Sequence, residues 1–239
     1  MKIGDCERSE KGRNGAVTIG GVIFDLDGTL LDTLDDIADS ANIVLAERGH
    51  PVHAVDAYRY FVGDGAPTLI HRILPENRRT AEEQAVCLQR YREVYAVRWK
   101  LKTVPYPGIA AMLGGMAARG MRLAVLSNKP HDATEECVRG FLGDVTFDVV
   151  QGQTATYPRK PDPAGAFSIA RAFGIAPAAC LYVGDTATDM QTAVRAGMIP
   201  VGVLWGFRTA DELTGHGATR LVAHPSELIS LLEDRTRRS

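Results

Sequence analysis

The chain has 239 residues, of which 45% are hydrophobic and 23% are charged, and its formal net charge is -2 at pH 7. This composition is typical of a soluble globular protein and gives no general attraction for nucleic acid or for an anionic membrane surface. The length suits one large α/β unit, or one domain that carries an insertion.

The N-terminal segment and the cysteines indicate a cytoplasmic protein. The first residues, MKIGDCERSEKGRNGAVTIG, carry charge where a signal peptide needs an apolar core, and no run of about eighteen apolar residues could span a membrane. We therefore expect neither export nor membrane insertion, and we expect residues 1–17 to form a disordered tail. The four cysteines have no C-x-x-C spacing and the six histidines form no zinc-binding pattern, which predicts reduced thiols.

Short apolar runs of strand length follow one another along the chain and alternate with amphipathic segments. The runs are VIF (22–24), RLAVL (122–126), FDVVQ (147–151), CLYVG (180–184) and PVGVL (200–204). Helical patterns lie between them at 108–120, 131–143, 162–174 and 186–197. Continuous apolar runs are typical of parallel strands that are covered on both faces, so this order predicts a doubly wound parallel α/β sheet with right-handed crossovers.

One connection is far longer than the few residues that are usual in α/β units. Residues 33–102 show helical periodicity with no strand of the buried type, and the proline-containing segment TVPYPG (103–108) follows them. We predict an inserted α-helical cap at 33–102, and a catalytic core formed by residues 18–32 and 103–239.

Acidic and polar side chains stand where several predicted strands end. Asp25 follows the first strand, Ser127 and Asn128 follow the second, and Asp185 follows the fourth, with Asp189 one helical turn later. Ligands bind at this edge of open parallel sheets. Converging carboxylates repel one another unless a cation lies among them, and oxygen ligands without histidine or cysteine select Mg²⁺ or a similar hard ion.

The same region offers donors for phosphate oxygens. They are the hydroxyl groups of Thr29 and Ser127, backbone amides near Gly28, and the ammonium of Lys160, which stands just before Pro161 and a predicted helix. The combination predicts a site for a metal ion and a phosphorylated ligand.

Four segments, in this order along the chain, resemble the motifs of the haloacid dehalogenase-like superfamily of phosphotransferases. They are DLDGTLLD (25–32), VLSNKP (125–130), RKPDP (159–163) and VGDTATDM (183–190). The resemblance implies that Asp25 is the nucleophile that takes the phosphoryl group, and that Asp27 protonates the leaving oxygen and then activates water. Dehalogenases proper lack an acid at the position of Asp27, so its presence favours phosphate chemistry.

The expected site residues form a catalytic and a metal-binding group. The predicted catalytic residues are Asp25, Asp27, Thr29, Ser127, Asn128 and Lys160. The predicted ligands or supports of Mg²⁺ are Asp25, Asp27 through its backbone carbonyl, Asp185 and Asp189. The resemblance implies that Ser127 and Lys160 hold the phosphoryl oxygens, and that Asp189 supports the lysine and the metal from close by.

The predicted cap contains the stretch YFVGDGAPTLIHRIL (60–74), which looks like the specificity loop of phosphoglycolate phosphatases. We expect Gly63, Asp64 and Gly65 to form a tight substrate-binding loop and Arg72 to meet a substrate carboxylate, although a simple turn between helices would also need glycine. The segments SNKPHDAT (127–134) and VGVLWGF (201–207) favour the same branch.

The resemblance as a whole implies a Mg²⁺-dependent phosphatase that hydrolyses 2-phosphoglycolate to glycolate through an aspartyl phosphate. We expect a monomer or homodimer whose partner is a small phosphorylated metabolite, with no nucleic acid and no membrane.

Three alternatives stay open. The first is a phosphatase for another small substrate, such as a sugar phosphate, a nucleotide or pyrophosphate, because these differ only in what the cap recognises. The second is a phosphomutase, in which the aspartyl phosphate passes to a sugar instead of water. The third is a non-catalytic binding protein, which would be free to lose Asp25, Asp27 or Lys160, yet all three are present.

Overall fold

The computed structural model describes residues 18–236, so the tail predicted at 1–17 lies outside the described residues. Its centre is a parallel sheet of six strands in the order β5-β4-β1-β6-β7-β8. The strands are β1 (Gly21–Phe24), β4 (Arg122–Pro130), β5 (Val149–Gln153), β6 (Cys180–Gly184), β7 (Ile199–Val203) and β8 (Arg220–Val222). The chain builds outward from β1 to one edge and then returns to build the other side, which confirms the predicted doubly wound α/β fold.

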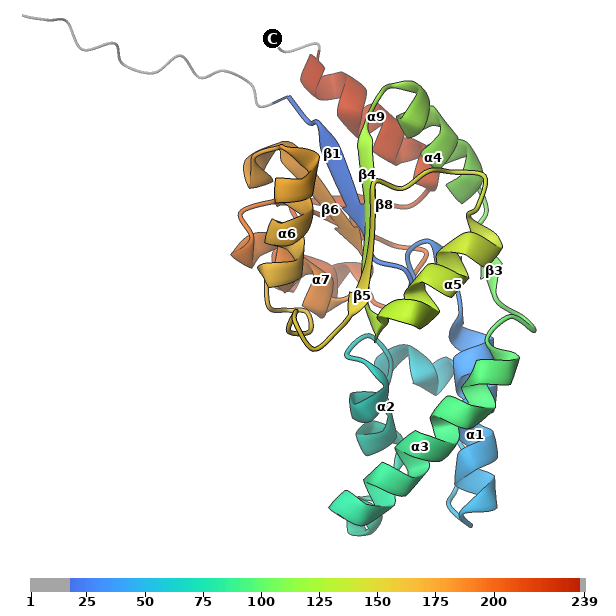
Figure 1. The fold of residues 1–239 in the computed structure, drawn as a ribbon. Helices are drawn as coiled ribbons and strands as arrows, with labels where there is room; N and C mark the ends of the chain where they lie inside the picture. The colour runs from blue at the N-terminus through green and yellow to red at the C-terminus, as the bar shows by residue number, and fades with distance from the viewer. Residues whose placement is uncertain (1–17, 237–239) are drawn as a thin grey trace, which may run out of the picture.

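Helices cover both faces of this sheet (Figure 1). One face carries α4 (Ile109–Ala118), α5 (His131–Phe141) and α9 (Pro225–Thr236), and the other carries α6 (Ala164–Phe173) and α7 (Ala187–Arg195). In β1, Val22 and Phe24 pack in the cluster on the first face, whereas Ile23 packs in the cluster on the second. Successive strand residues point to opposite faces, so a strand that is covered on both must be apolar throughout.

The sixth strand was not predicted. β8 lies at the edge of the sheet, and two of its three residues, Arg220 and Leu221, are exposed. It therefore lacks the continuous apolar run that identified the other strands. Two further short elements are η3 (Pro177–Ala179) and α8 (Ala210–Gly215). No helix within residues 18–236 is both long and apolar enough to cross a membrane.

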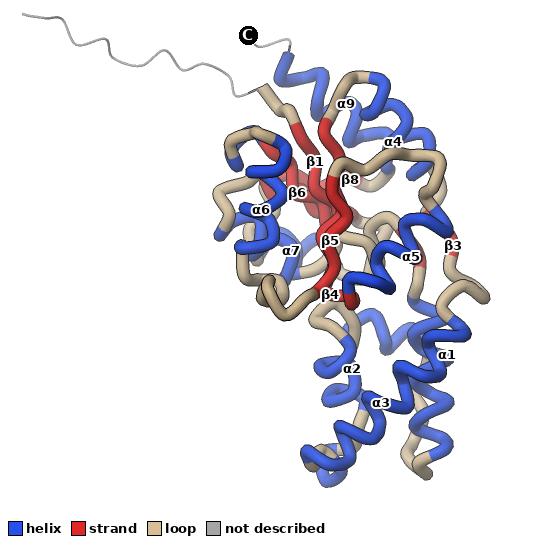
Figure 2. The backbone as a smooth tube through the Cα atoms, in the orientation of Figure 1, coloured by secondary structure: helices blue, strands red, loops and turns tan. Residues whose placement is uncertain are grey.

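A second, helical body follows β1 and lies beyond one end of the sheet (Figures 1 and 2). It consists of α1 (Leu34–Glu47), η1 (Val55–Tyr60), α2 (Ala66–Ile73), η2 (Glu76–Arg78) and α3 (Ala81–Arg98). This body has an apolar cluster of its own, which includes the fully buried Leu45, Tyr58 and Ile70. Phe207, from the segment after β7, joins this cluster, so the two bodies pack together at their junction.

The two connections between the bodies run side by side. β2 (Leu31–Asp32) on the way out pairs antiparallel with β3 (Val104–Pro105) on the way back. Asp36, which is fully buried in the first turn of α1, ties the returning chain to this helix. Its carboxylate accepts hydrogen bonds from the backbone N–H groups of Lys102 and Thr103 and from the Thr103 hydroxyl, at 2.8–3.1 Å.

We expect Asp36→Ala to lower the free energy of unfolding by about 2–4 kcal/mol, because two buried donors and one partly buried donor lose a charged acceptor. Urea denaturation followed by circular dichroism measures the change. Asp35→Ala is the matched control, since Asp35 is exposed in the same helical turn and should cost less than about 1 kcal/mol. Equal destabilisation by the two substitutions would contradict the role given to Asp36.

Candidate active site

The carboxyl ends of β1, β4 and β6 meet at one place. Phe24, the last residue of β1, is in register with Val125 of β4 and Val183 of β6. The backbone N–H of Asp25 donates to the Val183 carbonyl at 2.9 Å, which fixes Asp25 at the mouth of the sheet. β4 continues past its apolar part with an irregular register before Pro130, and this extension carries the polar residues that follow it in sequence.

A buried lysine links two of the predicted acids. Lys160 Nζ lies 2.7 Å from Asp25 Oδ1 and 2.7 Å from Asp189 Oδ1. Burial alone would lower the pKa of Lys160, but the carboxylates of Asp189 and Asp25 outweigh it and raise that pKa well above its ordinary value. Asn128 positions the lysine segment, because its Oδ1 accepts from the Lys160 N–H at 2.9 Å and its Nδ2 donates to the Lys160 carbonyl at 3.3 Å.

Asp25, Asp185 and Asp189 form a buried acidic cluster, in which one oxygen of each lies within 4.8 Å of the others. Burial raises the pKa of Asp25 well above its usual range, and the charges of Asp189 and Asp185 raise it further against the opposing effect of Lys160. Burial and the charge of Asp189 raise the pKa of Asp185 to about 7. Three carboxylates with one ammonium leave negative charge uncompensated, and oxygen donors of this kind suit a hard divalent cation.

Asp185 is enclosed by backbone and by two donors. The Phe207 N–H donates to its Oδ2 at 2.8 Å and the Thr29 hydroxyl donates to its Oδ1 at 3.0 Å. Gly28 has φ +89°, and a side chain at Gly28 or at Gly206 would overlap Asp185. Glycine at these two positions therefore allows the loop after β1 and the segment after β7 to pack directly against Asp185.

Asp189 serves the helix that carries it as well as the lysine. Thr186 and Asp189 form a capping box at the start of α7, in which Asp189 Oδ2 accepts from the Thr186 N–H at 3.1 Å and from its hydroxyl at 2.6 Å. Its other oxygen contacts Lys160. Both carboxylate oxygens of Asp189 are thus held in place, one by Thr186 and one by Lys160.

Of the two hydroxyl groups predicted to donate to phosphate, that of Ser127 lies at the cleft and that of Thr29 does not. Ser127 is buried but lines the cleft described below, and its Oγ accepts from the Lys129 N–H at 3.1 Å. Thr29 is fully buried, and its hydroxyl is used by Asp185. In this structure Thr29 therefore supports an acid of the cluster and does not line the cleft.

Asp27 has partners that were not predicted from the sequence. Lys129 Nζ lies 2.7 Å from Asp27 Oδ1 and donates to the hydroxyl of Tyr95, on α3, at 3.0 Å. Lys129 lies within the segment VLSNKP, two residues after Ser127, so its place at the end of β4 could have been recognised. Nothing in the sequence around Tyr95 marks it as a site residue. Only the packing of the two bodies brings it to the site.

The predicted substrate loop, Gly63 to Gly65, lies against the edge of the sheet. Its charged residue, Asp64, is paired with Arg72. The Gly63 carbonyl accepts from Asn128 Nδ2 at 3.1 Å, and Gly63 and Gly65 both have positive φ, at +111° and +84°. Asp64 accepts from the Thr188 hydroxyl at 2.5 Å and forms an ion pair with Arg72 at 2.6 Å. Gly63 and Gly65 line the cleft, whereas Asp64 and Arg72 do not.

A cleft of about 730 Å³ lies between the sheet and the helical body, and Asp25 and Asp27 open onto it. The sheet side contributes Ser127, Asn128 and Lys129, and the helical body contributes both glycines and the aromatic residues Tyr91, Tyr95 and Trp99. The predicted nucleophile, the predicted acid and the predicted loop therefore share one cavity that is large enough for a small metabolite.

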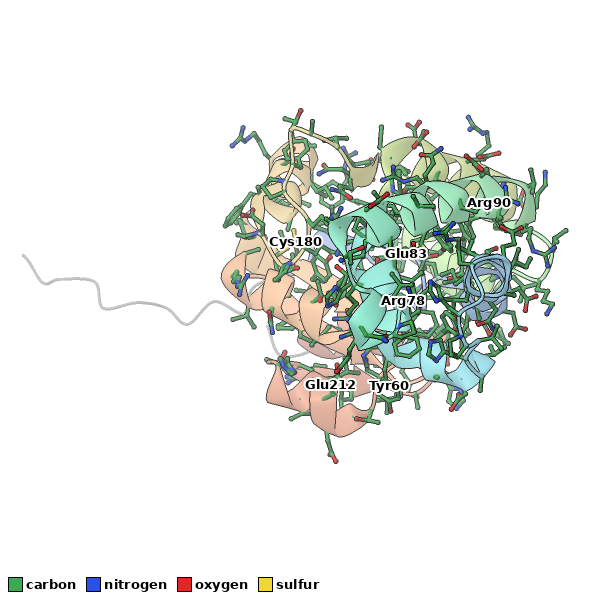
Figure 3. All side chains as sticks on the ribbon, turned by 90° about the horizontal axis from the view of Figure 1, so that it is seen from below. Tyr60, Arg78, Glu83, Arg90, Cys180 and Glu212 are labelled. Atoms are coloured by element: carbon green, nitrogen blue, oxygen red, sulfur yellow. The ribbon has the colours of Figure 1, made fainter. Side chains whose placement is uncertain are left out.

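A second group of possible metal ligands, His50, Glu83 and Cys87, lies in the helical body. Figure 3 is seen from this end of the molecule and shows Glu83 on the helices nearest the viewer. Glu83 already forms ion pairs with Arg48 at 2.6 Å and with His50 at 2.8 Å. Hydrogen bonds from Arg48 and His50 lower the pKa of Glu83 to about 2. This carboxylate is compensated without a metal, unlike the acidic cluster at the sheet.

Comparison with known proteins agrees with the site. The family described as haloacid dehalogenase-like hydrolase matches residues 22–203. A phosphoglycolate phosphatase of Cereibacter sphaeroides is 36% identical over 89% of this chain and 97% of its own length, and one of Pseudomonas syringae pv. syringae is 32% identical over 87% and 78%.

Solved structures agree in fold. The crystal structure of a "putative phosphoglycolate phosphatase" from Lactobacillus delbrueckii subsp. bulgaricus matches with a TM-score of 0.86 and 30% identity, over 90% of this chain and 98% of that one. The match of the family over most of the chain, together with these relatives, shows that the protein belongs to the haloacid dehalogenase-like hydrolases.

Proposed function

We propose that the protein is a Mg²⁺-dependent phosphatase that hydrolyses 2-phosphoglycolate to glycolate in the cytoplasm, through an aspartyl phosphate on Asp25. The observation that carries this proposal is the position of Asp25, which contacts Lys160, belongs to a buried acidic cluster and opens onto the cleft. The relatives that bear the name phosphoglycolate phosphatase support the choice of substrate.

The residues of the core divide the reaction into two displacements. An oxygen of Asp25 attacks phosphorus while the bond from phosphorus to the glycolate oxygen breaks, and Asp27 gives that oxygen a proton. Asp27 then takes a proton from the water that attacks the aspartyl phosphate, which releases phosphate and restores Asp25. Ser127, which lines the cleft, and Lys160, which contacts Asp25, would donate to the phosphoryl oxygens in both steps.

The acidic cluster is the proposed place for the metal. Asp25, Asp185 and the backbone carbonyl of Asp27 would hold Mg²⁺, and Asp189 would support them from behind. The all-oxygen donor set and the excess negative charge of the buried acids fit this ion. Mg²⁺, when bound, would supply positive charge that stabilises the phosphoryl oxygens.

We propose that residues 33–102 act as a cap that selects the substrate and excludes bulk water. Residues of the helical body form part of the cleft wall, and the two connections to the core lie side by side in β2 and β3. A body that is attached in this way can open for exchange of ligands and close for chemistry.

The first test is phosphate release from a panel of 2-phosphoglycolate, sugar phosphates, nucleoside monophosphates and pyrophosphate. We expect 2-phosphoglycolate to lead by at least about tenfold in kcat/KM, the usual scale of discrimination by pocket contacts, and we expect a chelator to stop turnover. A different leading substrate would overturn the proposed specificity, and a requirement for a sugar bisphosphate would favour the phosphomutase.

Asp25→Asn should lower kcat by about 10³-fold or more, because an amide cannot form the aspartyl phosphate. Assays with Mg²⁺ and circular dichroism of the same sample separate loss of chemistry from loss of fold. Asp32→Asn is the matched control, since Asp32 belongs to the same motif but is exposed on β2, and its activity should match that of the wild type. Normal turnover by Asp25→Asn would exclude Asp25 as the nucleophile.

Gly65→Val should reduce kcat/KM for 2-phosphoglycolate by about tenfold or more, while hydrolysis of p-nitrophenyl phosphate changes by less than about threefold. The reason is that Gly65 lines the cleft on the cap side, where its φ is +84°. Gly49→Val introduces the same side chain at φ +69°, in open space away from the cleft, and should leave both activities unchanged. Equal losses on the two substrates with Gly65→Val would show that the loop is structural only.

A further inference from the structure

A buried ammonium on the wall of the cleft takes no part in the chemistry described above. Lys129 extends from the end of β4 toward the cap, and its side chain is only 7% exposed. It lines the cleft together with Asp27 and Tyr95. Burial opposes the charge on Lys129, but Asp27 outweighs burial and raises the pKa of Lys129 well above its ordinary value, so the group stays charged.

The ammonium of Lys129 has a hydrogen-bond donor to spare. A lysine carries three N–H groups, and here one is directed to Asp27 Oδ1 at 2.7 Å and one to the Tyr95 hydroxyl at 3.0 Å. No third acceptor for Lys129 Nζ lies within hydrogen-bond distance among residues 18–236. A buried cation with an unused donor beside a cavity is suited to binding an anion.

The other cations near the cleft are less suitable. Lys160 is held between Asp25 and Asp189 at the site proposed for the phosphoryl group. Arg72 forms an ion pair with Asp64 and does not line the cleft. Arg92 and Arg139 line the cleft but are exposed, so water screens their charge. Arg159 also lines the cleft, beside Gly65, but it is only half-buried. Lys129 is the buried cleft cation whose position is separate from the phosphoryl site.

We propose that Lys129 binds the second anionic group of the substrate, which is the carboxylate of 2-phosphoglycolate, and thereby releases Asp27 to act on the leaving oxygen. This inference rests on the proposed function. The substrate carboxylate takes the unused N–H of Lys129, and by sharing the charge of the ammonium it weakens the contact of Lys129 with Asp27. The substrate carboxylate lies one carbon from the oxygen that leaves. A phosphate ester that lacks a second anionic group leaves the contact between Lys129 and Asp27 in place.

The test compares two substrates of equal carbon-chain length in the full-length enzyme. 2-Hydroxyethyl phosphate has a hydroxymethyl group where 2-phosphoglycolate has its carboxylate. We define the specificity ratio as kcat/KM for 2-phosphoglycolate divided by kcat/KM for 2-hydroxyethyl phosphate. Lys129→Met should reduce this ratio roughly 10- to 100-fold, the range expected for one hydrogen bond between charged groups.

Two further variants complete the test. Tyr95→Phe removes one hydroxyl that orients Lys129, so it should lower the ratio by a few-fold in the same direction. Arg92→Met removes an exposed cation from the same cleft, and its ratio should equal that of the wild type. If Lys129→Met does not fold, as judged by circular dichroism, Tyr95→Phe decides the question by the same criterion.

The outcomes separate this inference from the proposed function. A high ratio in the wild type that Lys129→Met or Tyr95→Phe leaves unchanged would overturn the role of Lys129 and leave the proposed substrate intact. Equal losses on both substrates would also overturn it, because Lys129 would then act only through Asp27. A wild-type ratio near one would overturn the proposed substrate, and the inference with it.

Discussion

The contact of Lys160 with Asp25 and Asp189 is the interaction on which the rest of the site depends. Removing a charge from water costs several kcal/mol even after relaxation, so three buried carboxylates at one sheet edge require compensation. A single ammonium at 2.7 Å from two of them supplies part of it, and the Phe207 N–H and the Thr29 hydroxyl supply donors to the third, Asp185. The excess negative charge that remains is the physical reason to expect a metal there.

Much of this arrangement could be predicted from the sequence, because parallel strands bring their carboxyl ends to one edge. Asp25 and Asp185 were identified in that way, and Lys160 from its place before Pro161 and a predicted helix, and the structure brings the three together. What could not be predicted depends on contacts between distant segments. The pairing of Arg72 with Asp64 and the approach of Tyr95 to Lys129 are set by how the cap folds and where it packs. The edge strand β8 was not predicted, because an exposed strand carries no continuous apolar run.

Polar contacts hold part of the helical body against the core, beside the apolar packing of Phe207 and of Trp99 against Phe141. Asn128 donates to the Gly63 carbonyl, Arg59 donates to the Gly206 carbonyl, and Arg208 donates to the Val62 carbonyl, at 2.9–3.1 Å. Each such bond contributes only about 0.5–1.5 kcal/mol net, because water takes the place of either partner on opening. The β2–β3 pair and the Asp36 contacts lie at the two connections between the bodies, so the proposed opening does not require the returning chain to detach.

The proposed reaction sets two tasks, acceleration of phosphate transfer and discrimination between leaving groups. They differ greatly in the free energy that each requires, and the two bodies of the molecule suit this division. Phosphate-monoester hydrolysis can require acceleration of up to ~10²¹, or roughly 29 kcal/mol, whereas one general acid or base contributes about 10²–10⁴, or roughly 3–5 kcal/mol. The larger share must come from covalent catalysis and from charges fixed around the phosphoryl group, which is the same in every substrate. These fixed charges belong on the core, where Asp25 follows β1 and Lys160 lies between β5 and α6. Discrimination between leaving groups needs only a few kcal/mol, and the contacts proposed for Lys129 and the cap glycines are sufficient in scale.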